Sequence, residues 1–280
     1  MQSGPSKATL QPFDARPMFE RVRASLLELL TDLPISEWHR PTPAGSWLVR
    51  DVVAHLLGDD VGRLSRSRDN HLGPGPDTNE SLSEFVNRYN EQWVRACARL
   101  SPQLLTDFLA HTSKEVLSYW QQVDLDALGE PVSWACPDQP APVWLDCARD
   151  FTEDWIHQQQ IRQGVARERT WDRAVLYAVI DTFMHAMSYT LDQEDLTDGD
   201  SLVVRLQPDL NNSWGWLRTN GRWSATRELS YSTTELISDA DTWWRLCVRM
   251  LSPSEARRRT EVNGDERLAR AALNIISIIG

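Results

Sequence analysis

The sequence lacks the features that define several classes of protein. No apolar run in its 280 residues approaches the roughly 20 residues that a membrane-spanning helix needs. Positive charge is also scarce, since 29 Lys and Arg stand against 40 Asp and Glu and give a formal net charge of −11. Binding to a phosphate backbone depends on clustered cations, so this balance argues against a nucleic-acid ligand. We therefore expect neither a membrane nor a nucleic acid as a partner.

Cysteine is rare, and its spacing fits neither a zinc ribbon nor a redox motif. The closest pair is eleven residues apart, and none of the four forms a CxxC motif (Cys97, Cys136, Cys147 and Cys247). The N-terminal sequence MQSGPSKATLQPF has no apolar stretch typical of a secretion signal. We expect free thiols and a cytoplasmic location, with two disulfides as the alternative.

The composition is that of a globular protein with many tryptophans. Hydrophobic residues make up 41% and charged residues 25% of the chain, and its length allows one large domain or two. Tryptophan accounts for 13 of the 24 aromatic residues. Most of them, including Trp47 and Trp155, are interpreted as packing anchors, because large aromatic side chains dominate buried cores.

The first 165 or so residues show the spacing of apolar side chains that is typical of helices. Prolines and glycines interrupt this pattern, and Ser81 with Glu84 forms a capping-box pattern at one helix start. Gly164 is placed to end the last of these helices at its C′ position. The expected helices cover residues 13–33, 47–64, 81–100, 102–128 and 143–163.

The pattern changes after about residue 165. Segments 196–207, 213–219 and 222–229 have the composition of short strands, with turn signals at Asp198-Gly199 and Asn220-Gly221. Further helices are expected at residues 171–191, 240–251 and 267–279. The fold class is therefore mainly α, with an α+β C-terminal part that holds a small, antiparallel sheet. We divide the chain into domains 1–165 and 166–280.

One pair of side chains has the spacing of metal ligands. Glu153 and His157 lie four residues apart on an expected helix, so both reach the same side of it. His55, in an otherwise apolar helix, is the best third candidate. Two imidazoles and one carboxylate would hold a divalent cation and leave a fourth position open, as catalytic zinc sites do.

Two ordinary interpretations compete with this one. Asp146, Asp150, Glu153 and His157 form a polar stripe that spacing alone assigns to a solvated helix face. A histidine among Val and Leu, such as His55, is commonly a hydrogen-bonded core residue.

The same segments resemble a known family. Residues 41–56, PTPAGSWLVRDVVAHL, are similar to a signature of the DinB/YfiT-like metalloenzymes, in particular the mycothiol-dependent maleylpyruvate isomerase group of actinobacteria. Residues 153–162, EDWIHQQQIR, resemble that family's second motif. The resemblance implies that His55, Glu153 and His157 bind Zn²⁺ or another divalent metal, and that mycothiol is a thiol cosubstrate. It also implies a DinB-like four-helix bundle for residues 1–165.

The resemblance extends to the C-terminal part, with some departures. Residues 214–216, 241–244 and 262–265 are similar to the family's sterol-carrier-like α+β domain. Gln160 stands where many relatives have an acidic residue, and residues 43–46 lack a cysteine that relatives often carry, so the substrate stays open. The family also uses an arginine of this domain, for which Arg218 and Arg222 are the candidates.

These observations lead to an expected function. The metal would stabilise the thiolate of mycothiol for attack on an electrophilic small molecule, in an isomerase or an S-transferase reaction. The alternatives are a thiol-independent metal hydrolase and a non-enzymatic small-molecule-binding protein.

Overall fold

The computed structural model describes residues 12–167, 172–226, 229 and 232–277 and divides the chain into two compact units. The helical unit holds Asp14–Ala127 and Cys147–Trp171. The sheet unit holds Leu128–Asp146 and Asp172–Ile278, together with residues near the N-terminus. The division expected at residue 165 stays a prediction.

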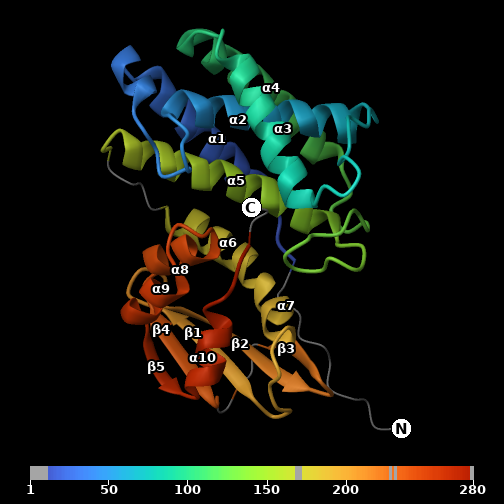
Figure 1. The fold of residues 1–280 in the computed structure, drawn as a ribbon, viewed down its shortest axis with the longest axis vertical. Coiled ribbons are helices and arrows are strands. Elements are labelled where there is room, and N and C mark those ends of the chain that lie inside the picture. The colour runs from blue at the N-terminus through green and yellow to red at the C-terminus, as the bar shows by residue number, and fades with distance from the viewer. Residues whose placement is uncertain (1–11, 168–171, 227–228, 230–231, 278–280) are drawn as a thin grey trace. The chain divides into compact units, whose positions relative to one another are not determined.

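The helical unit consists of five α-helices and two short helical turns. Its helices are α1 (Arg16–Thr31), α2 (Val49–Arg63), α3 (Leu82–Cys97), α4 (Pro102–Gln122) and α5 (Val143–Gly164), whose first turn belongs to the sheet unit (Figure 1). A 3₁₀ turn, η1 (Ile35–His39), precedes α2, and a π-helical turn, η2 (Leu64–Arg68), continues it. In this unit α4 packs against α1 and α2, and α3 packs against α2.

Apolar residues at helical spacing build the core of this unit. Leu26 and Leu30 of α1, Val52 and Leu56 of α2, and Leu109 of α4 are at most 2% exposed and belong to one cluster. Burial of each large aliphatic side chain contributes about 1.5–3 kcal/mol to stability. Because single helices are only marginally stable in water, this packing is what stabilises them. His55 lies between Ala54 and Leu56 of this core, so its backbone position is fixed by packing.

The end of α5 differs from the sequence-based expectation. Gly164 is the last residue of the helix, and the left-handed conformation falls on Ala166, with φ of 54°. Glycine is needed at position 164 for another reason, because a Cβ there would lie 2.7 Å from the carbonyl oxygen of Pro41. Close backbone approach, rather than chain reversal, explains this glycine.

The sheet unit packs helices with one five-stranded sheet. Its helices are α6 (Arg173–Met184), α7 (Ala186–Asp192), α8 (Ala240–Cys247), α9 (Pro253–Arg259) and α10 (Glu266–Ala272). Its strands are β1 (Ser201–Leu206), β2 (Asn212–Thr219), β3 (Arg222–Thr226), β4 (Thr234–Ser238) and β5 (Glu261–Gly264), in the order β3-β2-β1-β4-β5 (Figure 1).

The sheet is mixed, which corrects the expected antiparallel arrangement. β1, β2 and β3 form an antiparallel meander, and both central residues of the Asn220-Gly221 turn have positive φ, as a two-residue hairpin requires. β4, however, pairs parallel to β1, with Val204 opposite Leu236. The chain crosses from one edge of the meander to the other before β4, and a crossover connection gives parallel neighbours.

Several helices are shorter than the sequence pattern suggests. α4 ends at Gln122 instead of Leu128, since Val123 leaves the helical region with ψ of 138°. Residues 171–191 form two helices that break at His185, α8 ends at Cys247, and α10 ends at Ala272. Residues 171, 227–228 and 278–279 of the expected elements lie outside the described residues. The mainly α fold with an α+β C-terminal part is confirmed.

The cysteines and tryptophans are as predicted from the sequence. All four cysteines are described and carry free thiols. Ten of the thirteen tryptophans are buried, which fits packing anchors. Within the described part of the chain, none of the helices combines the length and the apolar composition that a membrane span requires.

His185 makes the stability of the sheet unit sensitive to acid. Its ring lies edge-on to Trp144, with centroids 5.0 Å apart, and burial lowers its pKa from 6.5 to about 4. The folded state keeps the ring neutral, so this stabilisation is present above pH 6.5 and is lost as the pH falls from 6.5 to about 4. The upper limit of this loss is about 3 kcal/mol. The actual loss is smaller, because the ring retains some exposure to solvent.

We expect the melting temperature of His185→Phe to fall less than that of the wild type between pH 7 and pH 4.5. Thermal unfolding followed at several pH values measures this difference. His111→Asn, at an exposed histidine, is the matched control and should follow the wild-type curve. Parallel curves for the wild type and His185→Phe would contradict the assignment.

Candidate metal centre

The segment before α2 is folded so that His55 begins the second turn of a well-capped helix. Asp51 accepts a hydrogen bond from the backbone N–H of Leu48 at 3.0 Å, and Thr42 donates to the carbonyl oxygen of Trp47. Asp51 therefore serves as a helix cap. The ring of Trp47 lies 4.9 Å from that of His55 and covers one side of it.

The three predicted ligands come together. His55 of α2 and Glu153 and His157 of α5 each offer a donor atom, and these atoms all lie within 4.8 Å of one another. Nε2 of His157 lies 3.5 Å from a carboxylate oxygen of Glu153, and the two imidazole rings are 4.7 Å apart. Both histidines are 7% exposed, whereas the Glu153 side chain keeps 33% of its exposure, so the imidazoles are buried and the carboxylate is partly open to solvent.

Two further polar side chains touch the histidines. Nδ1 of His157 lies 2.7 Å from Oε1 of Gln160, which leaves Nε2 directed toward Glu153. Nε2 of His55 lies 3.2 Å from Oδ2 of Asp59. Neither contact was predicted from the sequence, although residues three and four apart on a helix can touch.

Burial and neighbouring charge shift the protonation of these groups. Burial, and then the proximity of His157, lower the pKa of His55 to about 3. Burial alone would lower the pKa of His157, but the hydrogen bond and negative charge of Glu153 outweigh it and raise that pKa. Burial alone would likewise raise the pKa of Glu153, and the two histidines lower it instead. His55 is thus a neutral donor and Glu153 an anionic one.

Asp59 has a raised pKa. Burial within the cluster, and next the negative charge of Glu153, raise it well above its usual range. The side chain retains 41% of its exposure and therefore keeps part of its hydration. The negative charge of Glu153 thus acts on Asp59 at this site.

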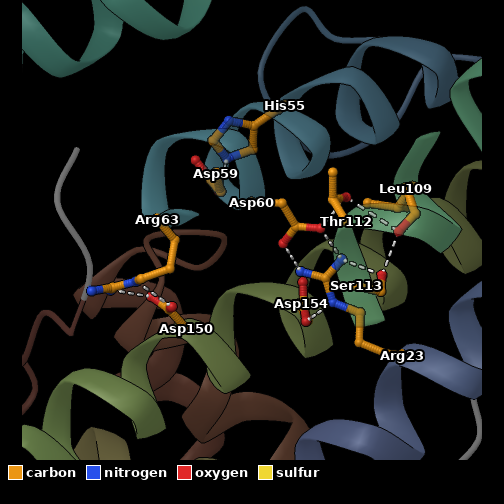
Figure 2. A network of polar contacts seen from close by, with 10 residues as sticks. All are labelled: Arg23, His55, Asp59, Asp60, Arg63, Leu109, Thr112, Ser113, Asp150 and Asp154. Carbon is orange, nitrogen blue, oxygen red and sulfur yellow. Dashed lines mark hydrogen bonds and ion pairs between the residues drawn. The ribbon is translucent and has the colours of Figure 1, made fainter. Parts of the chain in front are cut away.

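A buried ion network lies next to the site and joins four helices (Figure 2). Arg23 of α1, 4% exposed, donates two hydrogen bonds to Asp60 of α2, at 2.6 and 3.1 Å, and one to Asp154 of α5. It also donates to Ser113 of α4 at 3.1 Å, and Thr112 donates to Asp60 at 2.6 Å. The two carboxylates keep Arg23 charged by raising its pKa, whereas burial raises the pKa of both carboxylates.

A second pair joins α2 to α5. Arg63 donates two hydrogen bonds to Asp150, at 2.8 and 2.7 Å, and its guanidinium lies 4.9 Å from the ring centre of Trp120 (Figure 2). The cluster contains more carboxylates than guanidinium groups, a charge balance that favours a bound cation. Its carboxylates are Asp59, Asp60, Asp150, Glu153 and Asp154, and the arginines that act on them are Arg23, Arg63 and Arg149.

The two predicted arginines belong to the sheet unit. Arg218 of β2 is opposite Trp223 of β3, and its guanidinium Nε lies 3.6 Å from Asp198. Arg222 is exposed at the start of β3. Their role in the reaction stays a prediction.

The comparisons with known proteins identify the family of this chain. Residues 19–162 match the family model described as the mycothiol maleylpyruvate isomerase N-terminal domain. The match spans just over half of the chain, and the protein belongs to this family. The match confirms the predicted family, and with it the prediction that the protein is an enzyme.

Solved structures show the same fold. The crystal structure of the mycothiol-dependent maleylpyruvate isomerase is 11% identical, with a TM-score of 0.54, over 82% of this chain and 86% of that one. A mutant of the enzyme is 12% identical, with a TM-score of 0.52 and the same coverage. No curated protein sequence matches the chain.

The buried network yields a prediction about stability. Arg23→Met leaves Asp60 and Asp154 buried without their cation, and we expect the free energy of unfolding to fall by about 3–5 kcal/mol. Urea unfolding followed by tryptophan fluorescence measures this loss.

The control for this experiment is an exposed arginine. Arg68 is paired with Asp69 and Glu115 at the surface, and Arg68→Met should lower the free energy of unfolding far less than Arg23→Met does. Adding Asp60→Asn and Asp154→Asn to Arg23→Met should restore part of the lost stability. Equal stability of Arg23→Met and Arg68→Met would show that the network is not needed.

Proposed function

We propose that His55, Glu153 and His157 bind a divalent metal ion, with Zn²⁺ as the expected ion, and that the protein is an enzyme using mycothiol. The observation that carries this proposal is the convergence of the three donor atoms within 4.8 Å inside a buried, carboxylate-rich cluster. Two imidazoles and one carboxylate are the donors of catalytic zinc sites, which keep one position for a ligand. Membership in the family supports mycothiol as that ligand.

The bound metal would supply one kind of chemistry, namely stabilisation of the thiolate over the thiol. A thiol with a pKa of about 8.5 is only a few per cent ionised at pH 7, so complete ionisation would increase the nucleophile up to about thirty-fold. The residues of the chain hold the donors in place. Gln160 accepts from Nδ1 of His157 and fixes the tautomer that presents Nε2, and Trp47 shields His55 from water.

The substrate in this proposal is an electrophilic small molecule. Addition of the thiolate to a cis double bond, rotation about the resulting single bond and elimination of the thiolate would produce cis–trans isomerisation. Addition without elimination would produce an S-conjugate. Arg218 and Arg222 are proposed contacts for an anionic substrate, since guanidinium groups bind carboxylates well. We also propose residues 1–165 and 166–280 as the metal-binding and C-terminal domains.

The first test is metal analysis. Protein purified without chelator should contain about one equivalent of metal, and His157→Ala should contain less than about 0.2, because a site with two remaining ligands binds weakly. His71→Ala, at an exposed histidine, is the matched control and should keep its metal. Circular dichroism checks that both variants fold. A wild-type protein with less than about 0.2 equivalents would reject the enzyme in favour of a binding protein.

The second test concerns the thiol. Turnover of maleylpyruvate or a related unsaturated acid should depend on both mycothiol and metal. Chelation should lower the rate by up to about thirty-fold, because the thiol is then only a few per cent ionised at pH 7. Rates with and without mycothiol, before and after chelation, measure both requirements. Metal-dependent turnover without any thiol would favour a hydrolase and contradict the proposal.

A further inference from the structure

Asp59 is a carboxylate that touches a predicted metal ligand without belonging to the predicted set. It follows His55 by four residues on α2, and its Oδ2 lies 3.2 Å from Nε2 of His55. Figure 2 shows the Asp59 carboxylate beside the imidazole edge that carries this nitrogen. The buried network does not involve it, because Asp60 supplies the oxygens that bind Arg23.

The two ligand-bearing helices each present a histidine and a carboxylate one turn apart. On α5, Nε2 of His157 lies 3.5 Å from Oε2 of Glu153, and on α2 the corresponding distance from His55 to Asp59 is 3.2 Å. The polar contacts place α2 and α5 in antiparallel order, since Asp60 and Asp154 share Arg23 and, further along α2, Arg63 binds Asp150. Asp59 on α2 is therefore the counterpart of Glu153 on α5.

These separations are those of neighbouring ligands on one ion. Zinc binds nitrogen and oxygen at about 2.0–2.2 Å, so two ligands at right-angled to tetrahedral positions lie about 3.0–3.5 Å apart. Both histidine–carboxylate distances fall in this range. Each pair therefore has the separation of two ligands on one ion. Asp59 lies outside the set of donor atoms that are all within 4.8 Å of one another, so its side chain would turn toward Glu153 and His157 when the ion binds.

We propose that Asp59 is a fourth protein ligand of the metal, so that the resting site consists of two histidines and two carboxylates. This inference rests on the proposed function. Asp59 is the most exposed of the four side chains, at 41% against 33% for Glu153 and 9% for each histidine. It is consequently the ligand that an incoming thiol displaces, and it holds the open position until the thiol arrives.

The proposal is tested by metal affinity and by the spectrum of the Co²⁺-substituted protein. Asp59→Ala should bind Zn²⁺ more than about 100-fold more weakly in competition with a chelator, because loss of a supporting contact costs about 10–100-fold and loss of a ligand costs more. Its Co²⁺ absorption should also differ from that of the wild type, since one oxygen donor is missing. Glu115→Gln, which removes one negative charge at the surface of the same unit, is the control and should change neither property.

A histidine at position 59 separates a ligand from a merely electrostatic neighbour. Asp59→His introduces a neutral metal donor and should recover Zn²⁺ affinity relative to Asp59→Ala. Asp59→Asn keeps the shape but replaces the anionic donor, and it should bind weakly. Circular dichroism confirms that each variant is folded.

The outcomes distinguish this inference from the proposed function. A wild-type protein that binds no metal rejects the proposed function itself. A wild-type protein that binds metal, with Asp59→Ala unchanged in Zn²⁺ affinity and Co²⁺ spectrum, overturns the role of Asp59 alone. Weak binding by Asp59→Ala that Asp59→His does not improve assigns Asp59 an electrostatic role and also overturns the proposal.

Discussion

The helical unit depends on one buried cation, the guanidinium of Arg23. A charge so far from water is tolerated only when anionic groups surround it, and here Asp60 and Asp154 do so from two different helices. Ser113 adds a contact from α4. The helices α1, α2 and α5 are thereby held in one register, because sliding any of these three by a turn would leave a buried charge unpaired.

That register also places the site. Asp59 precedes Asp60 and Glu153 precedes Asp154, so each carboxylate that binds Arg23 follows, in the sequence, a carboxylate that lies beside a histidine of the candidate metal site. Along α2 and α5 the contacts follow at three levels, with the histidines at one end, the Arg23 carboxylates in the middle and the Arg63–Asp150 pair at the other end. The donors are held by charge pairing below them and by apolar packing around them, which limits the rearrangement needed to bind an ion.

Sequence reasoning recovered the parts of this molecule that depend on local pattern. The helices follow from apolar spacing, and the Asn220-Gly221 hairpin follows from turn chemistry. The ligand set came from a resemblance, since spacing alone favoured a solvated helix face. Contacts between distant segments, such as Arg23 with Asp154, leave no periodic pattern in the sequence and could not be predicted. Strands β4 and β5 were not predicted either, because their place in the sheet depends on a crossover connection. The contacts of Asp59 and Gln160 were within reach of helix spacing but needed the ring orientations.

The close approach at Gly164 has a consequence for the two family motifs. The loop that leads into Trp47 and His55 lies with the carbonyl of Pro41 directly against the last turn of α5, with no space for a methyl group. The two motifs, about a hundred residues apart in the chain, therefore meet backbone to backbone as well as through their donors. An insertion in that loop would move the Pro41 carbonyl and thereby the helix that carries Glu153 and His157. We therefore expect the length of the loop and the glycine at position 164 to change together among related sequences.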